Sequence, residues 1–144
     1  MRQVSGRAGG RVEKEFRRTF DSLDEIFQFI ESFLQTESSS PGLLHDVNFA
    51  VEELFTNMVK YCPDNDNDIL LDVAAADGGV TVTLTDFDVD EFDVTADREV
   101  DTSMPLDGRV PGGLGLHLVQ RMVDNLEYEY HDRQSTVRFT KDSG

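Results

Sequence analysis

Residues 46–61, DVNFAVEELFTNMVKY, are the stretch from which the fold can be inferred. Apolar side chains recur in it every three or four residues, which predicts a helix with one buried face. Glu53 and Asn57 lie one turn apart on the border of that face. A carboxylate and an amide at such a border are half buried and need polar partners. Taken alone, this pattern favours a structural interpretation: a surface glutamate next to a core-edge asparagine that bonds a neighbouring loop.

The segments on either side of this helix predict an α+β fold. In chain order they are a strand, two helices, a hairpin, a long loop, a third helix and a second hairpin. Hairpins combined with helices indicate a two-layer α/β sandwich, with a mixed, mostly antiparallel sheet and its helices on one face. We expect these elements at residues 13–20, 23–34, 41–61, 69–76 and 80–86, then from residue 113, and finally at 126–130 and 135–140.

Length and composition limit the class of protein. The chain has 144 residues, enough for one domain with a real core. We expect a flexible tail at residues 1–12 and a single domain at 13–141. The formal net charge of -16 argues against nucleic acid or an anionic membrane as the main partner. Only one cysteine is present, which is compatible with the cytoplasm, and no apolar run approaches membrane-spanning length.

Asp86 has an unusual place in the second strand of the first hairpin. Val80, Val82 and Leu84 alternate with three threonines, and Asp86 falls in phase with the apolar residues. Its carboxylate is therefore predicted to point to the core side of the sheet, where it costs several kcal/mol unless a donor is present. It either caps a turn by bonding nearby backbone amides or binds a donor group of a ligand.

A glycine-containing helix start follows a long segment without periodicity. Residues 87–112 form that segment, and a loop of this length in a small domain is usually functional or disordered. Gly113-Leu114-Gly115-Leu116 then opens a helix, where backbone amides and the helix dipole favour an anion. Although one such pattern is more often a turn, together with Glu53, Asn57 and Asp86 it is typical of a nucleotide site.

These motifs, in this order, resemble the GHKL (histidine-kinase-like) ATPase superfamily. AVEELFTNMVKY and GGLGLHLVQRMVDNLEYEY look like the bacterial anti-sigma factor serine kinases, and the resemblance covers about residues 13–141. It implies a Bergerat-type site for ATP and Mg²⁺, in which Glu53 is the general base, Asn57 ligates Mg²⁺ and Asp86 bonds the adenine amine. The implied phosphate contacts are Gly113, Leu114, Gly115 and Leu116, and the implied ATP lid is residues 87–112.

The resemblance also implies an activity and partners. Members phosphorylate a serine or threonine of a STAS-type anti-sigma antagonist and sequester a sigma factor, often as homodimers, and so regulate transcription. We therefore expect a protein serine/threonine kinase.

One departure from the family pattern favours an alternative. The usual motif is D-x-G-x-G or D-x-G-x-x-F, whereas this chain has Asp88 and Asp90 in place of the glycines. Asp88 therefore stands next to the expected nucleotide, and its side chain and charge act against a bound base or polyphosphate. The alternative is a degenerate, non-catalytic module that keeps the fold and regulates a partner by contact.

Overall fold

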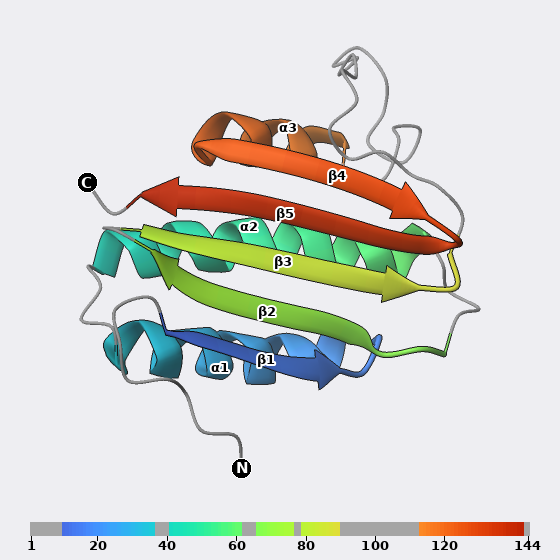
Figure 1. Ribbon diagram of the computed structural model, residues 1–144, viewed down its shortest axis with the longest axis horizontal. Helices are drawn as coiled ribbons and strands as arrows, with labels where there is room; N and C mark the ends of the chain where they lie inside the picture. The colour runs from blue at the N-terminus through green and yellow to red at the C-terminus, as the bar shows by residue number, and fades with distance from the viewer. Residues whose placement is uncertain (1–9, 37–40, 62–65, 77–78, 90–112, 143–144) are drawn as a thin grey trace.

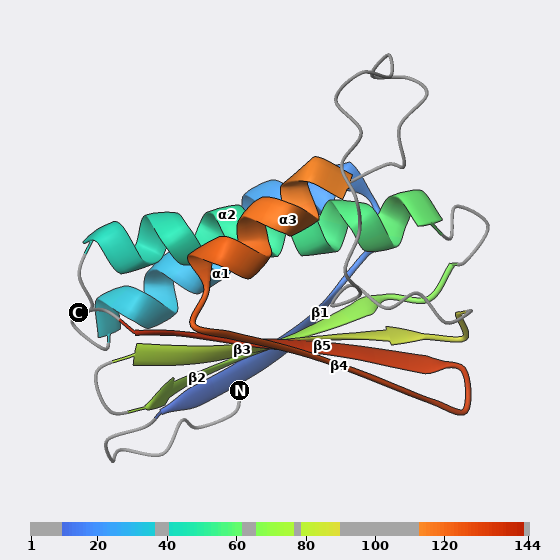
Figure 2. The same cartoon turned by 90° about the horizontal axis from the view of Figure 1, so that it is seen from above.

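The computed structural model describes residues 10–36, 41–61, 66–76, 79–89 and 113–142. Within them, helices cover one face of a sheet (Figures 1 and 2). The elements in chain order are β1 (Arg11–Phe16), η1 (Phe20–Ser22), α1 (Leu23–Thr36), α2 (Pro41–Tyr61), β2 (Ile69–Ala76), β3 (Gly79–Phe87), α3 (Gly113–Met122), β4 (Asn125–His131) and β5 (Gln134–Asp142).

The sheet has five strands in the order β1-β2-β3-β5-β4, and each of these pairings is antiparallel. β3 is central, so Val82 pairs with Val73 on one side and with Phe139 on the other. Strands placed in this way have one face against the helices and one that is left open (Figure 2). The predicted two-layer α+β sandwich with helices on one face is confirmed.

The core lies between α2 and the central strands. The apolar stripe predicted for α2 is buried at Val47, Ala50, Val51 and Leu54, which are no more than 1% exposed. From the sheet, Val80, Val82, Leu84 and Phe139 are buried against it. The side chains that helical periodicity in α2 and alternation in β3 predict to be buried therefore pack together in one apolar layer.

The first strand differs from its predicted extent. β1 begins at Arg11, so residues 11 and 12, which the sequence suggested for a flexible tail, pair with β2. It ends at Phe16 rather than Phe20, because the amide of Thr19 bonds the carbonyl of Arg17 and turns the chain. Phe20 consequently lies in η1 and is 50% exposed.

The second hairpin is longer than expected and turns at Asp132 and Arg133. Both residues have positive φ, of 51° and 63°, as the favoured two-residue hairpin turn requires. Of the expected lid at residues 87–112, Phe87, Asp88 and Val89 belong to the described part, and 90–112 lie outside it. Within the described residues, no helix combines the length and the apolar character needed to cross a membrane.

Candidate functional site

Asn57 is a buried amide without a hydrogen-bond partner among the described residues. It is 2% exposed, and neither its Oδ1 nor its Nδ2 atom makes a hydrogen bond in the described structure. Such an arrangement is expensive, because each buried polar group that lacks a partner costs about 1–3 kcal/mol. Asn48 Oδ1 of the same helix is likewise buried without a hydrogen bond in the described structure. An oxygen-seeking cation or a polar ligand would satisfy the Asn57 amide.

Replacing Asn57 by leucine is therefore expected to stabilise the protein. Leucine has the same branched shape and removes two unsatisfied atoms, so the free energy of unfolding should rise by about 1–2 kcal/mol. Chemical denaturation followed by circular dichroism measures this change. A clear loss of stability would mean that the amide has a structural partner.

Glu53 lies one turn before Asn57 and is partly buried. Desolvation raises the pKa of its carboxyl above the ordinary value of 4.5; the negative charge of Glu52 adds to the rise, and Lys60 opposes it. A carboxylate whose pKa is raised towards neutrality is a better general base, because it binds a proton more readily. The position and the environment of Glu53 thus suit the base that the sequence suggested.

The raised pKa of Glu53 predicts a pH-dependent stability difference. Because the folded protein holds this proton more tightly than the unfolded chain, the charged carboxylate destabilises the fold above its folded pKa and costs nothing well below 4.5. Glu53→Gln should therefore raise the melting temperature by roughly 1–2 °C at pH 7. The two melting curves should converge as the pH falls below 4.5. Equal melting temperatures at every pH would contradict the burial of Glu53.

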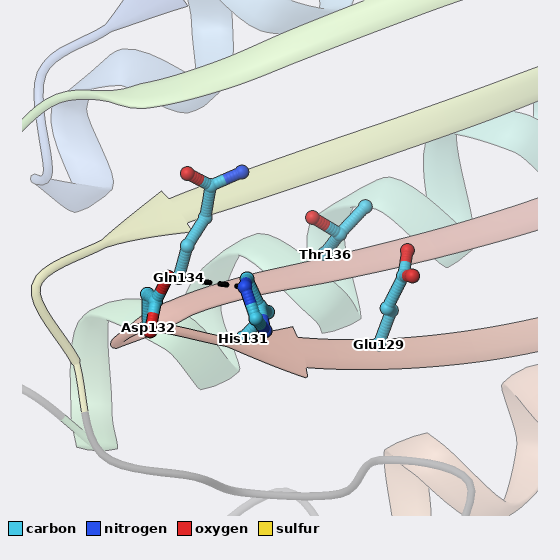
Figure 3. A pocket seen from close by; sticks show the side chains of 5 residues that line it. All are labelled: Glu129, His131, Asp132, Gln134 and Thr136. Atoms are coloured by element: carbon cyan, nitrogen blue, oxygen red, sulfur yellow. Dashed lines mark ion pairs between the residues drawn. The ribbon is translucent and has the colours of Figure 1, made fainter.

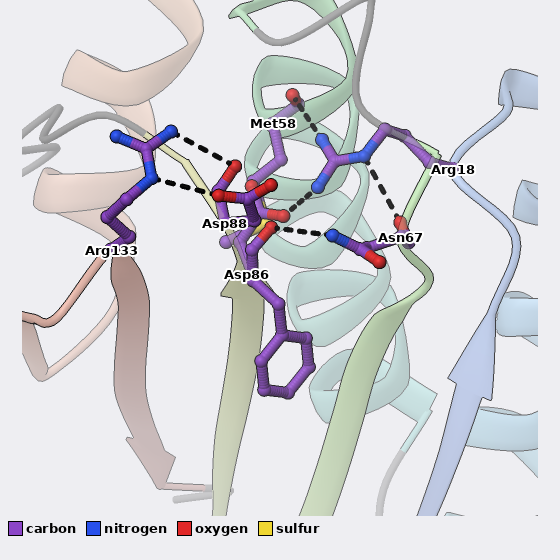
Figure 4. Close-up of polar contacts among 7 residues, drawn as sticks. Arg18, Met58, Asn67, Asp86, Asp88 and Arg133 are labelled. Atoms are coloured by element: carbon purple, nitrogen blue, oxygen red, sulfur yellow. Dashed lines mark hydrogen bonds and ion pairs between the residues drawn. The ribbon is translucent and has the colours of Figure 1, made fainter.

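Asp86 occupies the inward position predicted from the alternation of β3, and its partner is Arg18. The two side chains are 5% and 3% exposed and form a buried ion pair between Arg18 Nη2 and Asp86 Oδ1 (Figure 4). Sequence reasoning missed Arg18. The available signal was that an inward carboxylate needs a cation or several donors, and two adjacent arginines follow β1.

Arg18 joins the helix of Asn57 to the strand of Asp86. Its Nη1 donates to the carbonyl of Met58 at 2.9 Å, and its Nε donates to the carbonyl of Asn67 at 3.2 Å. One guanidinium therefore links the backbone of α2, at the residue that follows Asn57, to the carboxylate of Asp86 (Figure 4). The structure thus brings together the parts of α2 and β3 that the sequence nominated separately.

Asp88 has a backbone conformation that glycine adopts more readily than other residues. Its φ is 58°, in the left-handed region that glycine enters without strain and aspartate tolerates. Its side chain is 69% exposed and accepts a hydrogen bond from Arg133 Nε at 2.9 Å. The next residue, Val89, is buried and is held by Tyr130, whose hydroxyl donates to the Val89 carbonyl at 2.8 Å. Asp88 and Val89 are therefore bound to the β4–β5 hairpin.

The first turn of α3 is formed by the backbone of Gly113 to Leu116. In both cartoon views this end of α3 lies beside the C-terminal half of α2 (Figures 1 and 2). At the other end of α3, Lys141 Nζ donates to the carbonyl of Met122 at 2.8 Å and lies 3.7 Å from Asp46 of α2. Lys141 of β5 therefore contacts both α3 and α2.

A pocket on the molecule lies away from the residues described above. It lies on β4 and β5, on the face of the sheet that the helices leave open (Figure 3). Its ion pair, between His131 and Asp132 at 3.0 Å, is almost fully exposed and contributes little. None of the residues nominated from the sequence lines it; its lining is Glu129, His131, Asp132, Gln134 and Thr136.

A two-layer sandwich with a polar border on α2, an inward aspartate at the end of β3 and a glycine-rich helix start is the arrangement of a histidine kinase-like ATPase. A sequence model of the histidine kinase-like ATPase domain family matches residues 16–141, and the chain belongs to this family. A comparison with curated protein sequences finds no match.

Two solved structures share the fold. One contains the RsbU and RsbW domains of a Mycobacterium tuberculosis protein; it is 16% identical with a TM-score of 0.64, and the match covers 92% of this chain and 32% of that one. This chain thus spans about a third of that protein's chain. The other is the SiaB–SiaC complex from Pseudomonas aeruginosa, at 16% identity and a TM-score of 0.65, covering 90% of this chain and 88% of that one.

The family is one of ATPases, so the described residues can be tested against ATP with Mg²⁺. The unpartnered oxygen of Asn57 fits a hard cation. The described residues contain no group of three or more histidine, cysteine, aspartate or glutamate side chains that could hold a metal ion. Asp86 fits less simply, since Arg18 already engages one of its oxygens.

Proposed function

We propose that this protein is an ATP-binding regulatory protein serine/threonine kinase of the anti-sigma factor type. The observation that carries the proposal is the unpartnered Asn57 amide one turn from Glu53, whose pKa is raised by burial. Unsatisfied buried polar groups are uncommon in native proteins, and a bound ligand is one way to satisfy them. Phosphoryl transfer depends mainly on positioning and charge stabilisation, and these residues can supply both.

Each residue has a separate task in this proposal. Glu53 accepts the proton of the substrate hydroxyl, Asn57 offers its oxygen to Mg²⁺, and Asp86 accepts from the exocyclic amine of adenine. The N-terminal turn of α3, including Gly113, Leu114, Gly115 and Leu116, faces the phosphates. Asp88 borders the base, and its exposed side chain together with the left-handed backbone supports a site that stays open there. The Mg²⁺ ion would offset the charge of the transferred phosphoryl group.

The proposed substrate is a serine or threonine of a STAS-domain anti-sigma antagonist, in the cytoplasm. The kinase would form a homodimer and would release or sequester a sigma factor according to the phosphorylation of that antagonist. The fold shared with the RsbW domain and with the SiaB–SiaC complex supports a partner-binding role of this kind, at the level of the fold alone.

Transfer of labelled γ-phosphate tests the activity directly. Purified protein is incubated with Mg-ATP and a STAS-domain antagonist from the same genome, and label should appear on a single serine or threonine of the antagonist. A complex of the two proteins that forms but never transfers label would reject the kinase.

A second candidate, a non-catalytic module that regulates its partner by contact, is favoured by one observation. Arg18 already engages Asp86, and a base that needs this carboxylate has to share it with a guanidinium. In that case the protein would bind its partner equally well with and without Mg-ATP. A partner affinity that changes on addition of Mg-ATP would reject this candidate.

A further inference from the structure

We propose that Arg18 is a positioning residue for base recognition, which acts by fixing the carboxylate of Asp86. The inference rests on the proposed nucleotide-binding function and adds a residue that the sequence motifs do not contain. Arg18 comes from the connection between β1 and η1, outside the segments in which those motifs lie.

The guanidinium of Arg18 is itself held in place from two sides. The carbonyls of Met58 and Asn67 accept hydrogen bonds from Nη1 and Nε. These two bonds fix the orientation of the planar guanidinium independently of Asp86. The side-chain amide of Asn67 also donates to the carbonyl of Phe87 at 3.4 Å, which ties the same anchor to the residue after Asp86 (Figure 4). A rotation of Arg18 would break its contacts with α2 and with Asn67, which precedes β2, at the same time.

The guanidinium of Arg18, held in this orientation, sets the direction of the Asp86 carboxylate. With Oδ1 bound to Arg18 Nη2, the plane of the carboxylate is determined, and so is the direction in which it accepts further hydrogen bonds. A carboxylate accepts hydrogen bonds but cannot donate them when ionised. It therefore favours a base with an amine at the 6-position over one with an oxo group there, provided that its orientation is kept.

Selectivity between ATP and inosine triphosphate isolates this role. The two nucleotides share the ribose, the phosphates and the Mg²⁺ requirement, and their bases differ at position 6, amine against oxo, with the accompanying change at N1. Calorimetric affinities for both are measured on the wild type, on Arg18→Lys and on Arg18→Gln. Arg17→Lys is the matched control, since it changes an exposed neighbouring arginine in the same connection.

We expect Arg18→Lys to reduce the preference for ATP over inosine triphosphate roughly tenfold, because lysine lacks the planar guanidinium that orients the Asp86 carboxylate. Arg17→Lys should keep the wild-type preference. In an Asp86→Asn background, Arg18→Lys should change the preference no further, since Arg18 acts through Asp86. Thermal unfolding shows which Arg18 variants fold, and the preference is taken from those.

The alternatives give different results. If Arg18 has a purely structural role, its substitution would lower the affinities for both nucleotides equally and leave the preference for ATP unchanged. That result would overturn this inference while the proposed function stands. If Arg18 instead competes with the base for the Asp86 carboxylate, the Arg18 variants would bind ATP more tightly than the wild type. That result would also overturn the inference. A wild type that binds no ATP would overturn the proposed function, and this inference with it.

Discussion

Replacement of Arg18 by methionine should lower the free energy of unfolding by about 3–5 kcal/mol. The substitution removes one member of a buried ion pair and leaves the carboxylate of Asp86 charged and uncompensated in a site that is 5% exposed. It also leaves the carbonyls of Met58 and Asn67 without their shared donor. Urea denaturation followed by circular dichroism measures the loss, which is large compared with the stability of an ordinary domain.

Two comparisons separate this pair from ordinary surface charges. The double variant Arg18→Met with Asp86→Leu removes both charges and should recover most of the loss, because an apolar pair of similar volume is no less stable than a buried ion pair. Arg133→Met breaks the exposed pair with Asp88 and should cost less than about 1 kcal/mol. An Arg18→Met variant that is as stable as the Arg133→Met variant would contradict the burial of the pair.

Glu53→Gln should reduce the rate of phosphoryl transfer by about 10²–10⁴-fold, while Mg-ATP affinity stays within about twofold of the wild type. Glutamine keeps the size and the helix propensity of the side chain but cannot accept the proton of the substrate hydroxyl. Single-turnover transfer of labelled phosphate to a STAS-domain antagonist measures the rate, and calorimetry measures the affinity.

Glu52 provides the matched control for this experiment. It precedes Glu53 on α2, has the same chemistry and is exposed. Glu52→Gln should therefore leave the transfer rate nearly unchanged. If the two substitutions slow transfer equally, the base lies elsewhere and the effect is one of overall charge.

Much of the fold was predictable from local patterns. The 3.6-residue period of α2 and the alternation of β3 each identify a buried face, and both predicted faces are buried in the structure. The extent of β1 was not predictable in this way. Phe20 continues the apolar composition of the strand, but a turn at Arg17 and the inward direction of Arg18 end the strand at Phe16. The backbone turn between Arg17 and Thr19 thus ends the strand earlier than the apolar composition predicts.

The candidate site was predictable where a single element determined the direction of a side chain. Asp86 is buried, as strand phase predicts, whereas Asn57, which helical phase predicts to be half buried, is only 2% exposed. Arg18 could not be identified as the partner of Asp86, because the two residues are 68 positions apart and only the folded arrangement brings them together. The direction of Asp88 was also beyond local rules, since it depends on Arg133 of the β4–β5 hairpin.

The central claim is that the Glu53 and Asn57 border of α2 binds Mg-ATP. Calorimetric titration of the wild type and of Asn57→Ala with Mg-ATP tests it most directly. We expect the wild type to bind at submillimolar ATP, and Asn57→Ala to lose at least about tenfold in affinity, with the loss confined to titrations that contain Mg²⁺. No binding by the wild type at millimolar Mg-ATP, or equal affinity of the two proteins, would contradict the claim.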